Sequence, residues 1–284
     1  MIRGTKHLAT VKPLMKDAIA TGTTAYDVLM DWHPFQIPRG GCRLKSLHAQ
    51  ISGTQGVATG PTNLLDMTIL FGRSINGVAP PSLGASNAAL THINNVAARP
   101  HIMGQKYLDT SKLNETGNHA LFLGYHMIDI NAVDADYDEI AMFLEGEPSK
   151  YSFQSTPAEY VGSIEDTITG YQTIWLAVVS TDGGFDFGTG CMLDMAADST
   201  PGSSNDDPTV VTTTPVDIGL SGTDARLVFA VGDFIGSAAG VVIGKVTEVK
   251  GSSRVVVDYV REVVAHDQEI VNMTPITFNF GVEY

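Results

Sequence analysis

Residues 231–260, VGDFIGSAAGVVIGKVTEVKGSSRVVVDYV, decide the fold of the C-terminal part of this chain. Val241, Ile243 and Val246 belong to one β-branched run and residues 255–257 form a second, and β-branched side chains favour strands. The KGSS segment at 250–253 supplies turn residues between them, which predicts a β-hairpin. Several short strands expose many edges unless the sheet closes on itself. The stretch therefore predicts a small closed β-barrel.

The sequence before this stretch has the pattern of a β-sandwich. Short apolar segments alternate with clusters of Gly, Pro, Asn and Asp, as in a fold of many short strands. In LLDMTILF, the residues Met67, Ile69 and Phe71 fall on one face, as a half-buried strand requires. YQTIWLAVVS, at 171–180, is apolar on both faces and is expected to be a central strand, with Trp175 in or near the core.

These patterns predict an all-β protein with an N-terminal, jelly-roll-like β-sandwich followed by a small C-terminal β-barrel. The boundary is ADSTPGSSNDDP, which lacks large apolar residues and is rich in residues that favour turns and linkers. Ile276, Phe278 and Phe280 alternate near the C-terminus and are assigned to the barrel as its closing strand. The expected division is a basic arm (1–25), a sandwich (26–196), a linker (197–208) and a barrel (209–284).

Composition limits the classes of function. Among the 284 residues, 43% are hydrophobic and 17% are charged, which indicates a folded chain. A formal charge of −14 repels a phosphate backbone, so direct nucleic-acid binding is not expected. No run of about 20 apolar residues predicts a membrane span, and no signal peptide is expected. The two cysteines, Cys42 and Cys191, are too few for a disulfide framework.

One acidic stretch has part of the ligand spacing of a calcium loop. In VDADYDEIAMFLE, counted from Asp134, carboxylates occupy the first, third, fifth and twelfth positions. Glu139 stands at the sixth position, where such loops have glycine. The alternative interpretation is an acidic turn that leads into a strand. The candidate calcium ligands are Asp134, Asp136, Asp138 and Glu145.

No other motif predicts a catalytic or cofactor site. The chain lacks a G-x-S-x-G elbow, a phosphate-binding loop and an H-E-x-x-H helix. Its eight histidines show no recognised metal-ligand spacing. We therefore expect no enzymatic activity and no cofactor. A pair of carboxylates assembled from separate strands, as in a glycosidase, remains an open alternative.

The first residues carry the most uneven charge in the chain. Four cations precede the first acidic residue, Asp17, although the whole chain is strongly acidic. This arm is interpreted either as a solvated tail or as a tether that orders on a neighbouring subunit, with DNA as a weaker third candidate. The candidate partner-binding residues are Arg3, Lys6, Lys12 and Lys16, and the apolar anchors are Ile2, Leu8 and Leu14.

Four segments give the chain a resemblance to a known group of proteins. LKSLHAQISG, LLDMTILFGRSINGVAPPSLG, GYQTIWLAVVSTDGGFDFG and VGDFIGSAAGVVIGKVTEV resemble segments of virion structural proteins of marine tailed phages, cyanophages in particular. The resemblance implies a non-enzymatic protein, specifically a capsid decoration or cement protein, and it carries no active-site residues. Its implied partners are the major capsid protein or other virion proteins, together with copies of itself as a homo-oligomer.

The same resemblance implies a place on the outside of the capsid or in the tail of the virion, with the capsid surface favoured, and passage through the host cytoplasm during assembly. No membrane association is expected. The alternative is a tail-associated structural or carbohydrate-binding protein, including one that degrades glycans, because β-sandwiches often bind sugars. Sandwich and barrel folds alone do not separate these functions.

Overall fold

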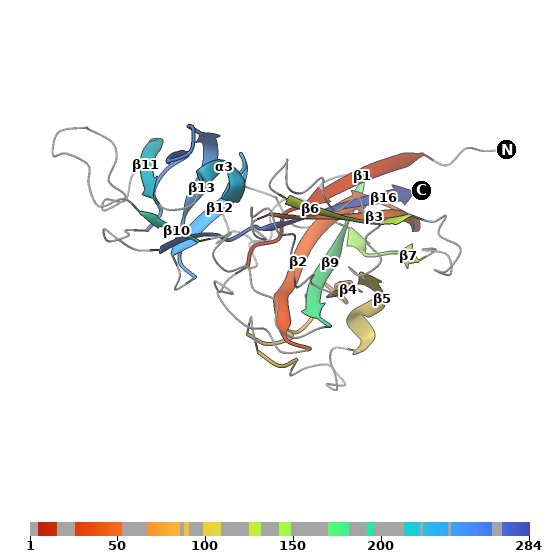
Figure 1. Ribbon diagram of the computed structural model, residues 1–284. Helices are drawn as coiled ribbons and strands as arrows, with labels where there is room; N and C mark the ends of the chain where they lie inside the picture. The colour runs from red at the N-terminus through yellow and green to blue at the C-terminus, as the bar shows by residue number, and fades with distance from the viewer. Residues whose placement is uncertain are drawn as a thin grey trace.

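The computed structural model is built almost wholly from antiparallel β-strands, so the predicted all-β class is confirmed (Figure 1). The structure describes residues 5–15, 26–52, 67–85, 88–90, 99–108, 125–131, 142–148, 170–181, 192–195, 213–221, 224–237, 240–262 and 269–284. Within these residues the helices are a 3₁₀ turn, η1 (Arg99–His101), and a single helical turn, α3 (Ala225–Val228). No helix in these ranges has the length and apolar character that crossing a membrane requires.

Eight strands form four nested antiparallel pairs, like the two arms of one long hairpin. The outer pairs are β1 (Lys6–Val11) with β16 (Ile276–Glu283), and β2 (Val28–Pro38) with β9 (Tyr171–Ser180). The inner pairs are β3 (Cys42–Ser52) with β6 (Tyr125–Asn131), and β4 (Met67–Gly72) with β5 (Ile102–Leu108). Rolling up such a hairpin produces a jelly roll.

The rolled hairpin makes two facing sheets. One has the strand order β1-β16-β3-β6, and the other has the order β2-β9-β4-β5. Two short strands extend them: β7 (Phe143–Leu144) pairs with β3, and β8 (Glu147–Pro148) pairs with β9. The core lies between the sheets, where the Phe280 ring sits 5.1 Å from that of Phe35 and 5.5 Å from that of Phe71, centroid to centroid. These contacts join the two layers.

The remaining strands close into a six-stranded barrel. Its strand order is β10-β11-β14-β13-β12-β15, returning to β10. The β13–β14 hairpin closes at Lys250, whose N–H donates to the Arg254 carbonyl, as the KGSS turn predicts. The barrel strands are β10 (Met192–Met195), β11 (Val216–Ser221), β12 (Phe234–Ser237), β13 (Val242–Val249), β14 (Arg254–Val257) and β15 (Glu269–Asn272).

The barrel is an insertion between the seventh and eighth strands of the jelly roll, and this changes the expected domain boundaries. β16 was assigned to the barrel by its alternating apolar residues, but it pairs with β1 and β3 in the sandwich. β10, placed in the sandwich by the 26–196 boundary, closes the barrel by pairing with β11 and β15. Local alternation identifies a strand, whereas its sheet depends on partners far away in sequence. The 197–208 linker lies outside the described residues.

The described part of residues 1–25 is not the arm that the sequence predicts. Residues 6–11 form β1 at the edge of one jelly-roll sheet, with Ala9 and Val11 buried in the core. Met15 is buried as well. These residues are not a loose tail, because their inward side chains contribute to the sandwich core. Figure 1 shows β1 beside β16, on the sandwich side of the molecule, with the barrel strands at the other end.

Candidate functional site

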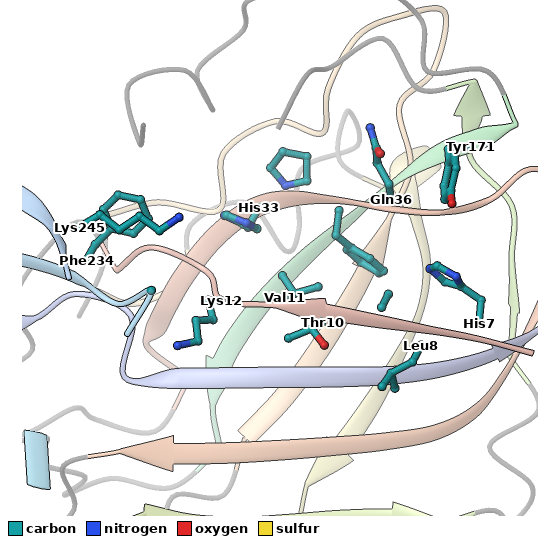
Figure 2. Close-up of a pocket in the computed structure, with 14 residues that line it drawn as sticks. His7, Leu8, Thr10, Val11, Lys12, His33, Gln36, Tyr171, Phe234 and Lys245 are labelled. Carbon is teal, nitrogen blue, oxygen red and sulfur yellow. The ribbon is translucent and has the colours of Figure 1, made fainter. Parts of the chain in front are cut away.

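A groove of about 660 Å³ follows the open edge of the sandwich and ends at the barrel (Figure 2). Its size lies within the range of small-molecule and peptide pockets. His7 and Tyr171 lie at one end, with ring centroids 6.1 Å apart, and Phe234 and Lys245 of the barrel lie at the other. The groove is lined by residues 7–12, residues 33–36, Tyr171, Gly232, Phe234 and Lys245.

The charge of the groove is opposite to that of the chain. Among the described residues, its lining contains two lysines, Lys12 and Lys245, and no aspartate or glutamate, although the chain has 31 acidic side chains. The Lys245 ammonium lies 5.8 Å from the centroid of the Phe234 ring, within the range of a cation–π contact. The groove is therefore a locally basic surface on an acidic protein.

His33 does not add to this positive charge at neutral pH. Burial lowers the pKa of its imidazole to about 4, because removing the ring from water disfavours the charged form. The side chain is neutral at pH 7 and acts there as a hydrogen-bonding group. Lys245 is therefore the lining residue that gives the groove its net positive charge, because Lys12 forms an ion pair with Asp233.

A buried carboxylate sits where the barrel end of the groove meets the sandwich. Asp233 is 1% exposed and its Oδ1 accepts a hydrogen bond from Lys12 Nζ at 2.7 Å. Its Oδ2 accepts from the Ala230 backbone N–H at 2.8 Å and from Asn272 Nδ2 at 3.0 Å. Burial raises the pKa of Asp233, and the attraction of Lys12 and the hydrogen bonds only partly oppose this.

The same network holds the chain where it passes from barrel to sandwich. Asn272 Nδ2 also donates to the Val228 carbonyl at 2.8 Å, and its Oδ1 accepts from the Thr274 backbone N–H at 2.9 Å. Thr274 Oγ1 accepts from the Phe234 N–H at 3.0 Å. We call Lys12, Asp233, Asn272 and Thr274 the Asp233 joint. It links the segment after β1, the barrel and the β15–β16 connection through satisfied buried polar groups.

The structure describes two of the four predicted partner-binding cations, and they differ in their surroundings. Lys6 is exposed on β1, and Lys12 forms the ion pair with Asp233 of the same chain. Arg3 and Lys16 lie outside the described residues. Of the expected apolar anchors, Leu8 is 65% exposed, whereas Leu14 packs against the buried cluster of Phe234, Val271 and Met273. Lys12 and Leu14 thus anchor the N-terminal segment to its own barrel.

The calcium hypothesis stays untested. Asp134, Asp136 and Asp138 lie outside the described residues, and Glu145 is exposed between β7 and β8. Over the ranges given above, no three His, Cys, Asp or Glu side chains are grouped as metal ligands would be.

Cys42 is an inert structural thiol. It is fully buried, and its Sγ donates to the Pro38 carbonyl at 3.2 Å. Burial raises the pKa of the thiol more than the hydrogen bond from Gln172 lowers it, so the reactive thiolate is disfavoured. Cys191 lies outside the described residues.

The chain was compared with protein-family models, with curated proteins and with solved structures, and no match was found.

Sequence reasoning missed both the groove and the Asp233 joint. Gly232 and Asp233 have the composition of a tight turn, and the Gly232 φ of 92° agrees with one. The additional role of Asp233 depends on Lys12, which is 221 residues away in sequence. The available signal was a single carboxylate between apolar residues, because such a group needs a buried partner.

Proposed function

We propose that this chain is a non-enzymatic structural protein of a tailed-phage virion, where it decorates or cements the outer surface of the capsid. The resemblance of four segments to virion structural proteins supports this proposal. The jelly roll agrees with it, since that architecture recurs in viral capsid proteins as well as in lectins.

The observation that carries the proposal is the interlocking of the two β-units. The barrel is inserted within the jelly roll, and the Asp233 joint binds it again to the segment after β1. Met15 adds a backbone hydrogen bond to the Met273 carbonyl at 2.7 Å. A unit held at several points keeps its outer surfaces in fixed positions, as a protein that bridges neighbouring capsid subunits requires.

The groove chemistry favours binding over hydrolysis. Glycoside hydrolysis commonly uses a pair of carboxylates, and covalent catalysis needs a nucleophile activated by a neighbouring base. The lining residues that the structure describes include no carboxylate and no cysteine, and the Thr10 hydroxyl donates to Asn279 Oδ1 rather than to a histidine. This composition supports a role in recognition.

A second candidate function is glycan binding by a tail-associated protein. The groove offers an aromatic ring at Tyr171 together with polar side chains at Thr10 and Gln36, a mixture found in sugar sites. A glycan array with purified protein tests this alternative. Binding that is lost in Tyr171→Ala, but kept in the matched surface variant Tyr107→Ala, would favour it over capsid decoration.

Particles produced without this gene test the primary proposal. Purified protein should bind such particles saturably, on the capsid and not on the tail, and should raise the temperature at which they release DNA. Isolated tails and empty buffer serve as controls. Binding only to tails, or no binding to either structure, would contradict capsid decoration.

A further inference from the structure

The groove side of β1 is an unpaired sheet edge. Thr5 and Tyr284 exchange both backbone hydrogen bonds, at 3.1 and 3.0 Å. Residues in an antiparallel pair alternate between bonding toward the partner and pointing away from it. With the regular β1–β16 register, His7, Ala9 and Val11 therefore bond toward β16. Lys6, Leu8 and Thr10 direct their N–H and C=O groups to the other side.

These outward groups have no backbone partner within the part of the chain that the structure describes. They follow the groove, since residues 7–12 of β1 and its continuation line one wall while residues 33–36 of β2 line the other. Figure 2 shows β1 running along the groove, with side chains of β2 above it. Unpaired donors and acceptors along a strand are a template for another strand.

We infer that β1 accepts an extended acidic segment of a partner protein as an additional antiparallel strand in this groove. Backbone hydrogen bonds to Lys6, Leu8 and Thr10 hold the segment, and the basic residues around the groove select its charge. This inference stands on the groove itself and does not require the virion location.

Charge identifies the occupant. Lys245 makes no ion pair within the described residues and faces the groove, and no acidic side chain is among the described residues that line the walls. Lys6 is exposed on β1, where it lies opposite Glu283 of β16. Acidic side chains on the added strand therefore meet Lys245 as a cation without an opposing carboxylate.

A second copy of β1 fits less well. The antiparallel self-pairing that uses the three outward residues sets Leu8 opposite Leu8 and Lys6 opposite Thr10. It places no acidic side chain against Lys6 or Lys245, and lysines on edge strands commonly prevent such pairing. The exposed Leu8 side chain, at 65%, is left for an apolar residue of a different segment.

The probe is a capped peptide of alternating glutamate and valine, equal in length to β1. Its binding to the full chain is measured by fluorescence anisotropy at low and high salt, and the amide hydrogen exchange of Leu8 and Thr10 is measured with and without it. We expect salt-sensitive binding that slows exchange at both amides. A peptide with prolines in place of the valines keeps the charge but loses the N–H donors, and it should not bind.

Two variants of the protein separate the backbone and charge contributions. Leu8→Pro removes an N–H that points away from β16, so the sheet is retained while binding falls at least about tenfold. Lys245→Glu should weaken binding several-fold. Lys106→Glu, on β5 at the opposite edge of the other sheet, is the matched control and should bind like the unaltered chain.

The inference is overturned by any of three results. The first is no binding at about 1 mM peptide, which corresponds to a binding free energy weaker than about −4 kcal/mol. The second is amide hydrogen exchange at Leu8 and Thr10 that the peptide leaves unchanged. The third is binding of the proline peptide as tight as that of the glutamate–valine peptide. Preference for a lysine–valine peptide or for a single-stranded oligonucleotide at the same site would also contradict it. None of these outcomes affects the capsid assignment, which is tested on particles.

Discussion

At the scale of single residues, Asp233 has an unusual relation between charge and stability. Its pKa is raised above 3.8, in the first place by burial. Between pH 3.8 and the folded-state pKa, the folded chain therefore holds more protons than the unfolded chain. The contribution of this residue to the free energy of unfolding is then largest at low pH and declines as the pH rises through that window.

Asp233→Asn isolates this effect because asparagine does not titrate. The free energy of unfolding of the variant, minus that of the unaltered chain, should rise with pH above 3.8 and become constant once Asp233 is ionised in both states. Urea unfolding at a series of pH values measures it. A difference that falls with pH would show that the pKa is lowered.

Asp217→Asn is the matched control of opposite sign. Burial raises the pKa of Asp217, but hydrogen bonds and attraction from Lys250 and Arg254 outweigh burial, and the net pKa is lowered. The free energy of unfolding of Asp217→Asn, minus that of the unaltered chain, should therefore fall as the pH rises toward 3.8.

Trp175 tests the packing on the face of β9 that points away from the sandwich core, because its neighbours Ile174 and Leu176 fill that core. It is 6% exposed on the central strand β9, as the sequence predicts, and its Nε1 donates to Ser74 Oγ at 2.8 Å. Trp175→Ala should lower the free energy of unfolding by about 3–5 kcal/mol. Phe143→Ala, at a ring that is 70% exposed, should change it by less than about 0.5 kcal/mol. Equal effects in denaturant unfolding would show that Trp175 is not buried.

At the scale of elements, the sequence predicts strands well and their partners poorly. The alternation of Met67, Ile69 and Phe71 correctly identifies β4, whose three side chains are fully buried. The alternation in β16 is equally clear, but the barrel assignment was wrong. Pairing of β16 with β1 joins residues about 270 positions apart, and no local pattern encodes that choice. The groove depends on the same pairing, so it was equally hidden.

Deletion of residues 1–16 tests the role of β1 as a core strand. A loose arm would leave the unfolding transition unchanged. The structure instead predicts a loss of several kcal/mol, because Ala9, Val11 and Met15 are buried and each large buried apolar side chain contributes about 1.5–3 kcal/mol. Leu8→Ser, at an exposed position on the same strand, is the control and should have little effect in thermal unfolding.

At the scale of the whole molecule, the insertion predicts how the chain responds to proteolysis. The composition of residues 197–208 favours cleavage there. Each resulting fragment would contain strands of both units, because β10 precedes the cut and β16 follows it. The nicked protein should therefore elute as one species in gel filtration and separate only in denaturant. Two independently eluting domains after a single cut would contradict the insertion.

The number of copies in an intact particle tests the proposed function most directly. Quantitative mass spectrometry of purified virions gives the ratio of this chain to the major capsid protein. A decoration protein follows the symmetry of the shell, so the account predicts a fixed simple ratio and on the order of hundreds of copies. A handful of copies per particle would assign the chain to the tail or a single vertex, and absence from virions would contradict the account altogether.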